Sequence, residues 1–108
     1  MSIKVRGKSD ATIKQFVVAL KSFQKDHPNA IIDLYRQWEF SISIRIIDVV
    51  FKDLDLVERH SLVEKYLMTI PEEPLSEVGM LVLITPQEKA KSMGNLEFED
   101  PVPAKGLP

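Results

Sequence analysis

The sequence contains no cysteine among its 108 residues. A chain without cysteine can form no disulfide, no thiolate metal site and no thiol redox centre. It also has no apolar run near the ~20 residues that a membrane-spanning helix needs. Its first ten residues, MSIKVRGKSD, lack the apolar stretch of a secretory signal. These absences predict a cytoplasmic protein that has no membrane partner.

The sequence also lacks any complete motif for catalysis or metal binding. It has two histidines, and no pattern pairs a nucleophile with a base, brings two carboxylates together or forms a phosphate-binding loop. Asp48, Asp53 and Asp55 are of the type that binds hard metals, but no binding-loop glycine accompanies them. The sequence therefore predicts a protein that is not an enzyme, with no catalytic residue, no metal site and no cofactor.

The length of the chain indicates one domain, and its charge distribution indicates a basic N-terminal segment. Residues 1–93 read as a single domain, whereas residues 94–108, with three prolines and three acids, read as a disordered acidic tail. The first 28 residues hold six basic and two acidic residues, although the net charge of the chain is −2. Lys14, Lys21 and Lys25 are therefore candidate contacts for nucleic acid, and the alternative is a solvated helix face.

Two helices are predicted from apolar spacing and capping residues. The first begins after Ser9 or Asp10 and ends before Pro28. The second begins after Asp55, with Glu58 completing a capping box, and ends before Pro71. The expected buried stripes are Ile13, Phe16, Val17, Leu20 and Phe23 in the first helix, and Leu56, His60, Val63, Leu67 and Ile70 in the second.

Three strands are predicted over residues 30–36, 40–46 and 78–84. The second strand alternates most clearly, and it predicts one buried face and one solvated face. The expected buried positions are Phe40, Ile42, Ile44 and Ile46, and the expected solvated positions are Ser41, Ser43 and Arg45. After the last strand, Thr85, Pro86 and Glu88 predict the start of a short helix that runs to about Ser92.

The order of these elements predicts an α+β fold, αββα(α)β. The strands are expected to form a three-stranded mixed sheet, with the two main helices on one face and a short turn between the second helix and the last strand. This arrangement would bury the apolar stripes of the two helices together.

The order and one stretch of sequence resemble the BolA-like family. The residues that carry the resemblance are Val50-Phe51, Leu56-Val57-Glu58-Arg59-His60, Leu62-Val63, Leu67 and Thr85-Pro86-Gln87-Glu88. The resemblance implies a fold similar to class II KH domains. It also implies action with a monothiol glutaredoxin in iron–sulfur cluster handling, or, as described for some members, regulation through DNA binding.

The residues that carry these activities in the family differ here. The family's cluster-ligating histidine would fall on Glu77 or near Gly79, and the family's second ligand, a cysteine or histidine, would fall within residues 36–39, which contain neither. The nucleic-acid-clamping GXXG loop of KH domains has no counterpart in residues 52–55, where two carboxylates stand.

The sequence therefore predicts a non-enzymatic BolA-like module that binds a protein partner, as a monomer or a dimer. The residues predicted to contact this partner are Trp38, Arg59, His60 and Lys65. Each of these residues also has a purely structural interpretation. Trp38 would cap the open end of the sheet, Arg59 would form a surface ion pair, and His60 would pack at the edge of the core. The alternative functions are a weak nucleic-acid-binding regulator, and an accessory factor whose monothiol glutaredoxin partner supplies every cluster ligand.

Overall fold

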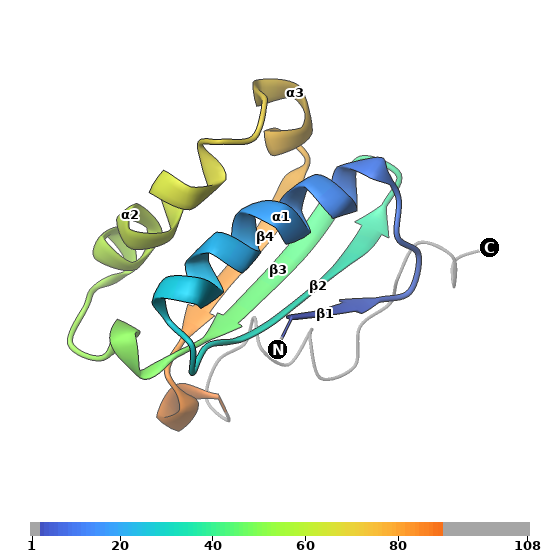
Figure 1. Cartoon of the computed structure of the whole chain (residues 1–108). Coiled ribbons are helices and arrows are strands. Elements are labelled where there is room, and N and C mark those ends of the chain that lie inside the picture. Colours follow the sequence, from blue (N-terminus) through green and yellow to red (C-terminus); the bar gives the residue numbers. More distant parts are fainter. Residues whose placement is uncertain (1–2, 90–108) are drawn as a thin grey trace.

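A computed structural model describes residues 3–89 of the chain and shows an α+β fold (Figure 1). Its elements are strands β1 (Ile3–Arg6), β2 (Ile31–Trp38), β3 (Ser41–Ile47) and β4 (Val78–Ile84), helices α1 (Ala11–Asp26), α2 (Leu56–Leu67) and α3 (Glu72–Leu75), and the 3₁₀ turns η1 (Val49–Phe51) and η2 (Pro86–Glu88). The α+β class is thus confirmed. The predicted tail at residues 94–108, the domain end at residue 93 and the helix end at about Ser92 lie outside the described residues.

The sheet has four strands in the order β1-β2-β3-β4, so the prediction of three strands is wrong. β2 and β3 form an antiparallel hairpin, while β1 runs parallel to β2 and β4 runs parallel to β3. Residues 3–6 are too few to give a strand pattern by themselves. They form β1 because Ile3 and Val5 pack against the core, and because Arg6 forms an ion pair with Asp33 on β2.

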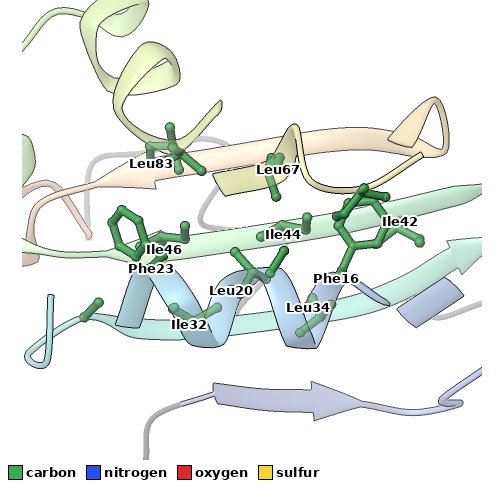
Figure 2. Packing of buried hydrophobic residues seen from close by; sticks show 14 of the residues in the cluster. Phe16, Leu20, Phe23, Ile32, Leu34, Ile42, Ile44, Ile46, Leu67 and Leu83 are labelled. Atoms are coloured by element: carbon green, nitrogen blue, oxygen red, sulfur yellow. The ribbon is translucent and has the colours of Figure 1, made fainter. Parts of the chain in front are cut away.

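The main core lies between the helices and one face of the sheet (Figure 2). Its α1 members occupy four of the five stripe positions predicted for that helix, and Val17 packs partly buried beside them. The capping residues are also confirmed. Asp10 accepts a hydrogen bond from the Ile13 N–H at 2.9 Å, and Asp55 with Glu58 forms the predicted capping box. Because residues of α1 and α2 share this core with the strands, both main helices cover the same face of the sheet, as predicted.

Three details of the predicted burial are wrong. Phe40 is exposed because it lies in the hairpin turn before β3 begins. Leu56 is exposed at the first position of α2, in which only Val63 and Leu67 are buried. The face of β3 that was expected to be solvated is instead buried at Ser43 and Arg45. Within residues 3–89, no helix is long and apolar enough to cross a bilayer.

Candidate interaction site between helix α2 and strand β4

A groove with a volume of about 520 Å³ lies between α2 and β4. Figure 1 shows α2 and α3 next to β4, at the edge of the sheet. The groove is lined mainly by apolar side chains, with one imidazole and one carboxylate among them. Its lining residues are His60, Glu64, Leu67, Met68, Leu75, Val78, Gly79, Met80 and Leu81.

The groove borders an open strand edge. β4 is the last strand in the sheet order, and no strand among residues 3–89 pairs with its outer side. An edge strand presents backbone N–H and C=O groups that can pair with an added strand. A Cβ atom at Gly79 would lie 2.3 Å from the Ser41 Oγ, so a larger residue at this position of β4 would require the Ser41 side chain to move. The site therefore combines an apolar groove with backbone hydrogen-bonding capacity.

His60 and Arg59 are neighbours in sequence, but their side chains contact different parts of the fold. His60 is half-buried and lines the groove. The Arg59 guanidinium instead donates to both carboxylate oxygens of Glu88, at 2.6 and 3.0 Å, and to the backbone carbonyls of Leu54 and Leu83, at 2.9 and 3.0 Å. Arg59 thus ties the start of α2 to the end of β4. We expect this clamp to be the role of Arg59, and His60 to be the member of the pair that faces a partner.

The ion pair between Arg59 and Glu88 should make stability depend on acid pH. Hydrogen bonds from Arg59 and from the Thr85 N–H lower the pKa of Glu88 from 4.5 to about 2. The ionised carboxylate therefore stabilises the fold above about pH 4.5, and this contribution is lost as the pH falls towards about 2. Because the Glu88 side chain is 43% exposed, we expect the contribution to be only about 1 kcal/mol.

Urea unfolding of wild type and Glu88→Gln between about pH 5 and about pH 2 measures this contribution. Wild type should lose about 1 kcal/mol more than the variant over this range. Glu64→Gln, which changes an exposed acid on α2, is the control and should follow wild type. Equal acid sensitivity of wild type and Glu88→Gln would show that the clamp contributes nothing measurable.

The other predicted partner-binding residues lie away from the groove. Lys65 is exposed on α2, and its ammonium group lies 5.3 Å from the centroid of the Tyr66 ring. Trp38 is exposed at the β2–β3 hairpin, next to the exposed Phe40, so it does not cap the end of the sheet. The structure therefore brings only His60, of the four predicted residues, into the α2–β4 groove.

A charged cluster formed by Arg36, Asp10 and Glu77 was not predicted from the sequence. The side chain of Arg36, which is 8% exposed, donates to Asp10 at 2.6 Å, to Glu77 at 2.8 Å and to the Glu39 carbonyl at 2.8 Å. The hydrogen bond from Arg36 lowers the pKa of Asp10. A basic residue at a core-facing position of an apolar strand was the one available signal. Because the Arg36 guanidinium is already engaged by these groups, we regard the cluster as structural.

The three lysines predicted to contact nucleic acid form one stripe along α1. Lys14, Lys21 and Lys25 are separated by seven and four residues, so they share one helix face, and all three are exposed. Val18, also exposed, lies on the same face. The structure therefore leaves these lysines accessible to an anionic partner.

The described residues offer little for a metal. Among residues 3–89, no group of three or more His, Cys, Asp or Glu side chains is placed to hold an ion. His27 stacks on Phe23, with ring centroids 4.4 Å apart, at a different part of the fold from His60. At the positions of the family's cluster ligand, Glu77 is ion-paired with Arg36, and Gly79 has no side chain to offer.

Comparisons with protein-family models, curated proteins and solved structures gave no match for this chain. The resemblance to the BolA-like family therefore stays a prediction from the residues that carry it.

Proposed function

We propose that the chain is a non-enzymatic, BolA-like interaction module that binds an extended segment of a protein partner. The observation that carries this proposal is the coincidence of an apolar groove with the open edge of β4. The element order αββα(α)β, preceded by the extra strand β1, also supports a BolA-like ancestry.

The shape of the site favours an extended segment over a helix. A segment that pairs with the outer side of β4 would form main-chain hydrogen bonds along the strand, and alternate side chains would point into the groove. The groove would take apolar side chains near Leu67 and Met68, while Glu64 favours a basic residue in the partner. His60 lies at the same groove and can donate to or accept from a polar group.

Met68→Glu tests the site without disturbing the core, because 68% of the Met68 side chain is exposed. Peptides selected on the full chain from a random linear library serve as the probe, and fluorescence anisotropy measures their affinity. We expect them to carry alternating apolar residues, and we expect Met68→Glu to weaken binding at least about tenfold, about 1.4 kcal/mol.

The matched control is Val18→Glu on α1, which places the same charge on another apolar residue that is also 68% exposed. This variant should bind the peptides like wild type. The proposal would be wrong if Met68→Glu bound normally, or if Val18→Glu abolished binding. Amide shifts confined to β4 and α2 during a titration would confirm the location.

One alternative is an accessory role in iron–sulfur cluster handling. The groove contains a single imidazole, that of His60, and a bridging cluster prefers thiolate or imidazole donors. A monothiol glutaredoxin would therefore supply nearly all ligands. Cluster absorbance in the visible range that changes when the two proteins are mixed would favour this role, and its loss in His60→Ala would place the cluster at the groove.

A second alternative is weak binding of nucleic acid, and the lysine stripe of α1 favours it. Three lysines can neutralise about three phosphates, so log K should fall with log salt with a slope of about −2 to −3. Peptide binding in the apolar groove should vary much less with salt. Filter binding at several salt concentrations therefore separates the two functions.

A further inference from the structure

The outer edge of β4 is occupied by a side chain near its C-terminal end. Ile84 uses its carbonyl towards β3, because this carbonyl accepts a hydrogen bond from the Asp48 N–H at 3.0 Å. The backbone groups of successive residues alternate between the two edges of a strand, so those of Leu81 and Leu83 point to the outer edge. There the Leu83 carbonyl accepts a hydrogen bond at 3.0 Å from the guanidinium of Arg59, which belongs to α2. Arg59 therefore closes the edge at Leu83.

Several groups hold the Arg59 side chain in this position. Its guanidinium also donates to the Leu54 carbonyl at 2.9 Å and to the two carboxylate oxygens of Glu88 at 2.6 and 3.0 Å. Only 12% of the side chain is exposed. A strand that paired with the Leu83 carbonyl would have to displace the guanidinium from this arrangement, and we expect such pairing to be unfavourable.

The apolar groove beside β4 ends at the same point of the strand. The residues of β4 that line it are Val78, Gly79, Met80 and Leu81, whereas residues 82–84 do not line it. The pairing between β3 and β4 is regular from Met80 to Ile84, with a register shift before it. Leu81 is therefore the outward-facing residue of the regular part that Arg59 does not cover, and it lies next to the groove.

We propose that Arg59 sets the register of the partner segment, by confining strand addition to residues 78–81 of β4. This inference rests on the proposed function and specifies where on the strand the partner pairs. Four extended residues span about 13 Å, so the paired part of the segment is short. Its main-chain hydrogen bonds centre on Leu81, and the side chains that enter the groove supply most of the specificity.

Amide hydrogen exchange of the full chain, followed by NMR, tests this register. The probe is a peptide selected from the linear library described above. In wild type, the bound peptide should slow exchange of the Leu81 amide at least about tenfold and leave that of Leu83 within about twofold of its rate in the free chain. In Arg59→Met the Leu83 carbonyl loses its donor, so the added strand can extend, and the peptide should slow both amides at least about tenfold.

Glu88→Gln is the matched control for lost stability. It also removes the ion pair, but it keeps the Arg59 guanidinium that donates to the Leu83 carbonyl. This variant should show the wild-type exchange pattern. Extending the peptide with threonines at both ends should raise its affinity at least about threefold for Arg59→Met, and should leave it unchanged for wild type and Glu88→Gln. Arg59→Ala is a second variant that exposes the same carbonyl if Arg59→Met folds poorly.

The outcomes separate the register from the proposed function itself. Equal slowing of Leu81 and Leu83 in wild type would show that Arg59 does not set the register, and strand addition at β4 would stand. The same conclusion would follow if Glu88→Gln relaxed the register as much as Arg59→Met. A bound peptide that slowed neither amide would overturn strand addition, and the register with it.

Discussion

Replacing Arg36 with methionine is expected to lower the free energy of unfolding by about 3–5 kcal/mol. The guanidinium is almost fully buried, and it joins the N-cap of α1, through Asp10, to the residue before β4, Glu77. Methionine has a similar length but offers no donor. It would leave two partly buried carboxylates and the Glu39 carbonyl without their partner, and such unpaired groups are more costly than the pair itself is stabilising.

Urea unfolding at neutral pH measures the effect, with the midpoint and the slope reported separately. Arg36→Lys should recover only part of the loss, because a single ammonium group cannot reach all the acceptors that the guanidinium fork serves. Combining Arg36→Met with Asp10→Asn and Glu77→Gln should restore some stability by removing the unpaired charges. A loss below about 1 kcal/mol for Arg36→Met would show that the cluster behaves as an ordinary surface ion pair.

Phe16→Ala is expected to destabilise the chain by a similar amount, about 3–5 kcal/mol. The Phe16 side chain is fully buried, and Figure 2 shows it reaching from α1 towards Ile42 on β3. Removing the ring loses its apolar contacts and leaves a cavity between helix and sheet. Thermal and urea unfolding should agree on the loss.

Val18→Ala, two positions along the same helix, is the matched control. Val18 is exposed, so its truncation should change stability by about 0.5 kcal/mol or less. Comparable losses in the two variants would contradict the core described between α1 and β3.

The helix-facing half of this fold could be predicted from the sequence. The apolar spacing of α1 and the alternation of Ile42, Ile44 and Ile46 indicated which side chains face each other, and both sets are buried. The capping residues Asp10 and Asp55 were equally readable, because a cap is a local hydrogen bond between residues three apart. The bounds of β4 followed from a short apolar run between turn residues.

The candidate site was readable only in part. His60 was named from sequence, but the groove that it lines depends on α2 lying beside the edge of β4, and this is a tertiary contact. Tertiary contacts also determine the role of Arg59, because its ion-pair partner Glu88 lies 29 residues away in the sequence. No local pattern connects residues so far apart, so the sequence alone left a surface ion pair and a partner-binding residue as open readings of Arg59.

The sequence by itself determined the two main helices with their caps, the three later strands and the helix-facing side of the sheet, because these depend on the spacing of neighbouring residues. Only the tertiary structure decided that residues 3–6 form a fourth strand, that Ser43 and Arg45 on β3 are buried, and that Arg36 and Arg59 form ion pairs between distant elements. Each of these features depends on partners that are distant in the sequence. The sequence pattern of a strand does not show whether a polar side chain is solvated or paired with an opposite charge.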